Sequence, residues 1–268
     1  MPAAPRIFAW LAAEAFSDAV RRRIVPAIAA LALISLFFID TCTSCSPSLT
    51  SGGEAVTLPQ VAGAGGLAMM VLLGLWTAVL AGVLAADHLT EPLNDGSANL
   101  LLARPISRVG YALARLAGAW AMAALAGAVV LGATAWLLYV RQGLIAGPAV
   151  AATSLILLNG VCVAALAMAL SLWLGSTLTS LAVLASVWGL ASIEVATQLG
   201  SEFSGPIGAF AAIGPPLAAA PIAALAPWLG PEAPEGVNVA LVTARALAWA
   251  VASAVLLVAV FRRVELGR

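Results

Sequence analysis

Asp87, His88 and Glu91 have the side-chain types from which a metal site or a proton-transfer site could be built. Imidazole and carboxylate groups are common metal ligands and common general acids or bases. Their spacing matches no diagnostic metal motif, and His88 is the single histidine of the chain. A polar cluster at a helix end is therefore the favoured interpretation, and we predict no metal site and no catalytic residue.

Two cysteines and one buried carboxylate are the other candidates. Cys42 and Cys45 form a C-x-x-C pair. In an oxidising compartment such a pair could be a redox couple or hold a soft metal, although a plain disulfide or two unpaired thiols is the favoured interpretation. Glu194 is the main charge within a long apolar stretch. Such carboxylates are costly and often functional, but Glu194 also lies close enough to the end of its stretch to reach water.

Several classes of protein are excluded by what the sequence lacks. There is no G-x-x-x-x-G-K-[ST] phosphate loop, so the chain does not hydrolyse nucleotide by that route. There is no H-E-x-x-H motif of a metallohydrolase. The formal net charge is +0, which gives no basic surface for nucleic acid.

The composition indicates a protein that is embedded in a lipid bilayer. Hydrophobic residues make up 63% of the 268 residues, and charged residues only 9%. A soluble domain has about 25% charged residues, which cover its surface. Long unbroken apolar stretches also lack the alternation of a barrel strand, so the chain is expected to be an all-α membrane protein.

Six stretches are long enough to cross a bilayer, which needs roughly 20 apolar residues in a helix. The predicted spans are 24–40, 64–86, 114–139, 149–174, 180–199 and 240–261. In the second span Gly74, Ala78 and Gly82 recur every four residues, which permits close helix contact within the chain or across a dimer.

The arginines predict the orientation. Most of them precede the first span, lie between the second and third spans, or follow the sixth: Arg6, Arg21, Arg22, Arg23, Arg104, Arg108, Arg115, Arg262, Arg263 and Arg268. With six spans these segments share one side, and only Arg141 and Arg245 fall near the other. Positive residues concentrate on the cytoplasmic side, so both termini are expected in the cytoplasm.

Two segments are expected to lie outside the spans. Residues 1–23 form an amphipathic helix that is expected to lie in the cytoplasmic interface before a transmembrane domain of residues 24–268; the alternative is a solvated leader helix. Residues 200–239 are rich in proline, which breaks helices repeatedly. We expect 206–229 to form short helices or a re-entrant hairpin on the external side, packed on protein.

The cytoplasmic loop 87–115 carries the densest polar signal. Asp95 or Ser97 could cap a short helix over residues 98–103 that Pro105 ends, and Ser107 could cap the next helix. The short helix carries three consecutive leucines, Leu100, Leu101 and Leu102. It could dock into the groove of another protein or rest on lipid headgroups, and physical arguments alone favour neither.

The order of these features resembles the permease subunits of type 2 ABC transporters, and most closely the branch that includes the permease of the nitrous-oxide-reductase maturation system. The resemblance rests on the helix over 12–23 and on residues 87–115, where an acidic stretch and a glycine precede Leu100-Leu101-Leu102-Ala103-Arg104-Pro105-Ile106-Ser107-Arg108. The family often carries several glutamates before the glycine. This chain has only Glu91 and Asp95 there, which puts the details of docking in doubt.

The resemblance implies a multi-pass permease of the bacterial inner (cytoplasmic) membrane that pairs with a second copy of itself. Each copy would bind a separate cytoplasmic ATPase, which holds ATP and magnesium, while the permease itself binds no cofactor. The coupling segment would comprise Glu91, Asp95, Gly96, Leu100, Leu101, Leu102, Arg104 and Pro105. Residues 206–229 would be the external gate, and transport would be export.

Two other classes of function remain open from the residues. The chain could be a membrane scaffold that assembles partners without transport. It could also be a membrane-embedded enzyme that uses Asp87, His88 and Glu91, or Glu194. The apolar spans carry no charge pattern that would name a substrate, so lipids, peptides, antibiotics and copper or sulfur species all stay possible.

Overall fold

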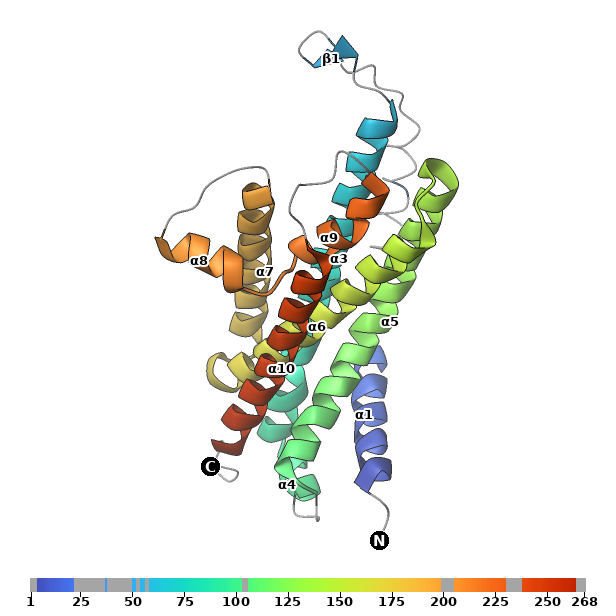
Figure 1. The fold of residues 1–268 in the computed structure, drawn as a ribbon. Helices are drawn as coiled ribbons and strands as arrows, with labels where there is room; N and C mark the ends of the chain where they lie inside the picture. The colour runs from blue at the N-terminus through green and yellow to red at the C-terminus, as the bar shows by residue number, and fades with distance from the viewer. Residues whose placement is uncertain are drawn as a thin grey trace.

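The computed structural model describes residues 4–21, 37, 50–51, 54–55, 58–102, 106–198, 205–229 and 238–263. This part of the chain is helical apart from a short antiparallel pairing of β1 (Thr50–Ser51) with β2 (Glu54–Ala55). The helices in Figure 1 are α1 (Ala4–Arg21), α3 (Leu58–Asn94), α4 (Ser97–Leu102), α5 (Arg108–Gln142), α6 (Ala146–Leu174), α7 (Ser176–Gln198), α8 (Gly205–Ile213), α9 (Ala219–Leu229) and α10 (Val239–Arg263).

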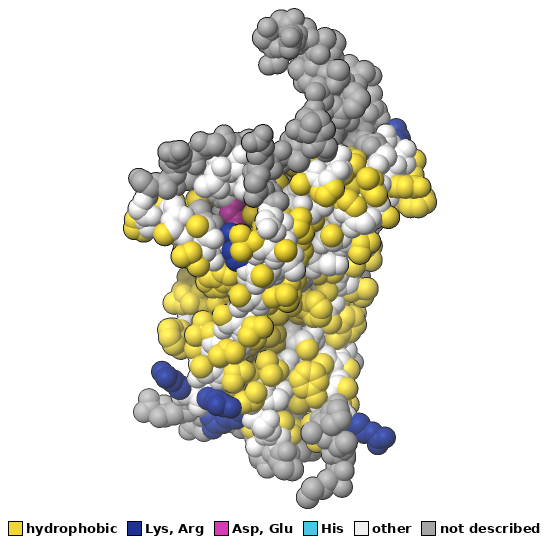
Figure 2. All heavy atoms as spheres, viewed as in Figure 1, with side chains coloured by type: hydrophobic (Ala, Val, Ile, Leu, Met, Phe, Trp, Pro, Cys, Tyr) yellow, Lys and Arg dark blue, Asp and Glu magenta, His cyan; other side chains and the backbone are white. Residues whose placement is uncertain are grey.

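Five of the described helices are long and apolar enough to cross a membrane, namely α3, α5, α6, α7 and α10. Figure 2 shows the consequence, because hydrophobic side chains cover the middle of the bundle. The chain is a multi-pass membrane protein. The predicted first span, 24–40, lies outside the described residues apart from Phe37, so the predicted count of six spans stays a prediction.

The other five predicted spans coincide with observed helices, with one clear difference. The expected loop begins at Asp87, whereas α3 continues to Asn94 and includes Pro92. Leu89 and Pro92 are buried in this extension, so packing holds the added turns in the helix. Proline interrupts one backbone hydrogen bond, and the helix ends two residues later.

The predicted small-residue stripe of α3 makes contacts within the chain. A Cβ atom added at Gly74 would lie 2.9 Å from Ile156 of α6, and one at Gly82 would lie 2.6 Å from Val183 of α7. Because glycine has no side chain, α3 can pack closely against α6 and α7 at these two positions. Of the alternatives left open by the sequence, contact within the chain accounts for the stripe.

Helix α1 packs along α5 (Figure 1). It buries Leu11 and Ala15, while Phe8 and Trp10 are exposed. The buried stripe of this amphipathic helix therefore runs through Leu11 and Ala15. Docking on α5 selects this stripe. Placement in the membrane interface remains a prediction.

The proline-rich segment forms two short helices, as expected, and they differ in environment. Every residue from 214 to 225 is buried, which includes most of α9. By contrast, α8 exposes Ile207, Phe210 and Ile213. Neither helix reaches the length of a span, so 206–229 is not a seventh crossing in the described residues.

The bundle has two ends that matter for function. We call the end with α4, Arg108 and Arg263 the terminal end, since both chain termini lie there in Figure 1. We call the end with the turn at Gly143 the distal end. Most of the arginine side chains visible in Figure 2 gather at the terminal end.

Candidate functional site

The predicted docking segment begins with a capped turn between α3 and α4. The backbone N–H of Asp95 donates to the carbonyl of Glu91 at 3.0 Å, and Gly96 adopts a φ of 78°. The Ser97 backbone N–H then donates to the Asp95 carboxylate at 2.8 Å. Asp95 is thus the capping side chain. The short helix runs from Ser97 to Leu102, so that it begins and ends one residue earlier than the expected range of 98–103.

The capping hydrogen bond also lowers the pKa of Asp95. The hydrogen bond from the Ser97 backbone N–H holds the pKa of the Asp95 carboxyl below its usual range, with a smaller contribution from the Arg115 charge. Asp95 and Glu91 are both exposed. The segment therefore presents two acidic side chains to its surroundings.

Two side chains of α4 pack toward the bundle. Ala98 is fully buried, and Leu102 is half-buried against the core. Leu100 and Leu101 belong to α4, but the placement of their side chains lies outside the described part. Arg104 and Pro105 also lie outside it. Leu102 therefore helps to seat α4 on the bundle.

The start of α5 meets the end of α10 at the terminal end. Ser107 caps α5 as expected, because its hydroxyl accepts from the Gly110 N–H at 3.0 Å. The rings of Tyr111 and Phe261 stack with their centroids 6.1 Å apart. Arg108 donates to the carbonyl of Arg262 at 3.4 Å. The first turn of α5 is thus in direct contact with the last turn of α10.

A buried arginine joins α1 to this region. Arg115, counted from the sequence as a loop arginine, is only 4% exposed. Its guanidinium lies 3.6 Å from the Glu14 carboxylate and 5.4 Å from the centre of the Tyr111 ring. Sequence reasoning missed this pair. The available signals were an acidic residue in the amphipathic helix and an arginine at the edge of an apolar stretch.

The candidate metal ligands of the sequence do not form a metal-binding group in the described part of the chain. Asp87, His88 and Glu91 occupy the last turns of α3. His88 is 2% exposed and faces the core, whereas Glu91 is exposed. The helix therefore directs these side chains into different environments.

Glu194 forms the densest polar cluster at the distal end. It is 5% exposed, and its carboxylate lies 2.9 Å from the Arg245 guanidinium of α10. The other oxygen accepts from the backbone N–H groups of Ala218 and Ala219 at 2.6 and 3.2 Å. A charged carboxylate is stabilised there by an opposite charge and by the start of α9.

Three further bonds hold the same turn, which spans residues 212–219. Arg245 donates to the carbonyl of Ala212 at 2.9 Å. Trp249 donates to Ile213 at 2.6 Å, and Asn159 of α6 donates to Pro216 at 2.7 Å. Side chains of α6, α7 and α10 therefore converge on one turn.

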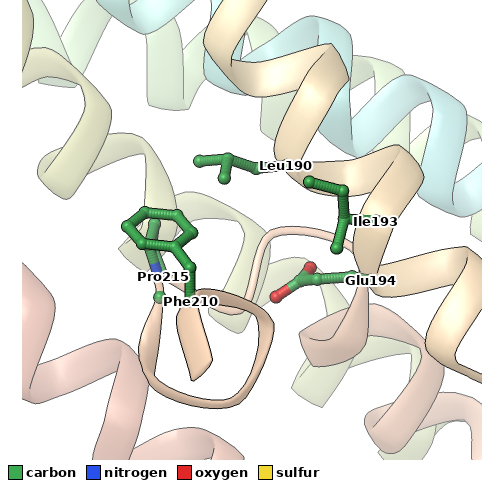
Figure 3. Close-up of a pocket in the computed structure, with 6 residues that line it drawn as sticks. Leu190, Ile193, Glu194, Phe210 and Pro215 are labelled. Atoms are coloured by element: carbon green, nitrogen blue, oxygen red, sulfur yellow. The ribbon is translucent and has the colours of Figure 1, made fainter. Parts of the chain in front are cut away.

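A small pocket lies beside this cluster, between α7 and α8. Its volume is about 10 Å³, which is barely room for one water molecule. Figure 3 shows Leu190 and Ile193 on one side, Phe210 and Pro215 on the other, and the Glu194 carboxylate at its edge. The walls are apolar, so the carboxylate is the polar feature of the site.

The sequence could have pointed to Arg245 as the partner of Glu194. Both residues lie near the distal ends of antiparallel helices, one four residues before Gln198 and the other six residues after Val239. A lone acid and a lone base at matched depth are natural partners in lipid. Of the cysteines, Cys42 and Cys45 lie outside the described residues, and Cys162 is buried. Comparison with models of known protein families and with curated proteins found no match for this chain.

Proposed function

We propose that the chain is the membrane-spanning permease subunit of an ABC transporter. It binds a separate cytoplasmic ATPase through residues 91–105 and uses the cycle of that subunit to move a substrate, most simply outward. ATP and magnesium belong to the partner. The permease works as a homodimer in a bacterial inner membrane, with its terminal end in the cytoplasm.

The connection of α4 to the bundle supports this proposal most directly. Asp95 caps α4, Leu102 seats it on the core, and two long helices leave it on either side. A force on α4 therefore acts directly on α3, against which α4 packs, and the chain continues from α4 to α5. A short helix that merely rests on headgroups has no need of such packing.

Contacts beyond α4 extend the same path. The start of α5 stacks on α10 through Tyr111 and Phe261, and Arg115 ties it to Glu14 of α1. A displacement that reaches α5 would pass to α1 and α10 through these contacts. Rigid secondary elements in contact are the physical basis of such coupling.

The test is capture of the ATPase from native membranes. A tag at the carboxyl terminus is used for purification in mild detergent, and a phosphate-loop ATPase is expected to co-purify. The decisive variant changes Leu100 and Leu101 to Asp and keeps Leu102, because Leu102 packs on the core. Loss of the ATPase, with the protein still folded and dimeric, is the expected result.

The matched control is Ile145→Asp. Ile145 is 57% exposed in the turn before α6 at the distal end, so this change adds a charge to an apolar site without touching α4. The control should retain the ATPase. If the unaltered protein brings down no ATPase while folded, the transporter proposal fails and a membrane scaffold becomes the better account.

A further inference from the structure

The two short helices at the distal end are attached to the bundle in different ways. Helix α9 packs against α6, α3 and α10, and residues 214–225 are buried throughout. Helix α8 packs against α7 and leaves Ile207, Phe210 and Ile213 exposed. Thus α9 is part of the protein core, and α8 lies over its edge.

The end of α8 is held by two donors of α10. Arg245 and Trp249 donate to the carbonyls of Ala212 and Ile213 at 2.9 and 2.6 Å. The last carbonyls of a helix have no partner inside the helix, so these bonds satisfy groups that would otherwise be costly in lipid. They fix where α8 ends relative to α10.

The Arg245 guanidinium makes a second bond with its other terminal nitrogen. It lies 2.9 Å from Glu194, whose second oxygen holds the N–H groups at the start of α9. One planar cation therefore connects α7, α8 and α10. The two bonds depend on each other, because the Glu194 charge orients the guanidinium that reaches α8.

Much of the surface of α8 is not packed on the bundle, since Ile207, Phe210 and Ile213 are exposed. The small pocket of Figure 3 lies between Phe210 and Leu190, on the side of α8 toward α7. Gly214 follows directly, and a Cβ atom at this position would lie 2.7 Å from the carbonyl of Phe210. The backbone can fold back this closely only because residue 214 is glycine, and the rigid Pro215-Pro216 pair follows it.

We propose that α8 is a flap hinged at Gly214 and that the Glu194–Arg245 ion pair is its latch. With the pair intact, the flap closes the pocket between α7 and α8. When the pair separates, the Ala212 carbonyl loses its donor and α8 swings away, while α9 stays in the core. This device does not depend on whether an ATPase drives the chain.

The competing explanation is a static brace, in which the pair simply stabilises the whole distal end. The test uses a thiol-free background with Cys42→Ser, Cys45→Ser and Cys162→Ala. Leu190→Cys reports on the pocket, and Ala223→Cys, on the buried face of α9, reports on general loosening. The rate of reaction with N-ethylmaleimide is measured for each reporter in membranes.

The latch is opened with Glu194→Gln, which keeps the shape and can still accept from Ala218 but loses the charge that holds Arg245. We expect Leu190→Cys to react at least tenfold faster in this variant and Ala223→Cys to remain unreactive. Trp249→Phe removes a neutral bond only and should increase the Leu190→Cys rate less. Arg245→Lys, whose single ammonium cannot span both partners in the same way, should fall between them.

Two results would overturn the latch. An unchanged Leu190→Cys rate in both Glu194→Gln and Arg245→Lys would mean that the pair does not control the flap. Equal acceleration of Leu190→Cys and Ala223→Cys would mean that the pair braces the whole distal end. If Glu194→Gln fails to fold, Arg245→Lys and Trp249→Phe carry the same comparison.

Discussion

Gly118 is the residue at which α1 comes closest to α5. A Cβ atom there would lie 2.5 Å from both the Ala15 Cβ and the Ala12 carbonyl oxygen. Gly118→Ala should therefore push α1 away, and overpacking of this kind costs about 1–3 kcal/mol. We expect a lower midpoint of thermal unfolding in detergent. The exposure of α1 should rise as well, measured as the reactivity of a Leu11→Cys reporter.

The control lies on the same helix. A Cβ atom at Gly132 would meet nothing within 4 Å. Gly132→Ala should leave the unfolding midpoint unchanged or raise it, because alanine favours a helix by up to about 1 kcal/mol over glycine. Equal effects of the two substitutions would show that α1 is not held by this contact.

The sequence identified charged residues inside the spans better than it identified their partners. Glu194 stood out as a charge in an apolar stretch, but the role of Arg245 as its partner did not. Arg115 was assigned to a loop and is buried against Glu14. Pairing depends on how each helix is rotated. A span whose faces are all apolar, such as α6, carries no periodic pattern from which that rotation could be inferred.

Helix α4 should depend on pH through its cap. The pKa of Asp95 is lowered in the folded chain by the Ser97 N–H, so its stabilising effect is complete above the usual aspartate value of about 3.9. The effect is lost as pH falls below that value. Hydrogen exchange of residues 97–102 should therefore be steady from pH 8 to 5, after correction for the intrinsic rate, and should rise near pH 3.

The control for this prediction is Asp95→Ala. Without the carboxylate the cap is absent at every pH. Exchange in α4 should be faster than in the unaltered protein at pH 7, and the extra increase near pH 3 should disappear. A pH response that survives in Asp95→Ala would assign it to another group.

At the scale of elements, the helices were easier to predict than their ends. Runs of about 20 apolar residues predicted α5, α6, α7 and α10 within a few residues, and the caps at Asp95 and Ser107 followed from side-chain chemistry. The end of α3 was wrong, because burial of Leu89 and Pro92 outweighs the local signal of a loop. Tertiary packing of this kind is absent from local sequence.

For the molecule as a whole, the charge distribution is more uneven than a count of arginines suggests. Arg245 was one of two exceptions to the predicted orientation, and Glu194 compensates its charge at 2.9 Å. A neutralised arginine opposes insertion much less than a solvated one. Of the arginines that are exposed in the described residues, Arg6, Arg108, Arg262 and Arg263 lie at the terminal end, and Arg141 lies at the distal end. This supports a cytoplasmic terminal end.

Three single-cysteine reporters in the thiol-free background test that orientation and the number of crossings. Ile145→Cys lies at the distal end, Arg263→Cys ends α10, and Phe8→Cys lies on α1; all three positions are exposed. With a membrane-impermeant maleimide, Ile145→Cys should be labelled in intact cells. Arg263→Cys and Phe8→Cys should be labelled only after permeabilisation.

Phe8→Cys determines whether the number of crossings is even. Five described spans alone would put α1 and the end of α10 on opposite sides of the membrane, whereas a sixth crossing between Arg21 and Leu58 puts them on the same side. Labelling of Phe8→Cys in intact cells, together with protection of Arg263→Cys, would contradict six spans. Labelling of Arg263→Cys in intact cells would reverse the orientation, and α4 would then be out of reach of any cytoplasmic ATPase.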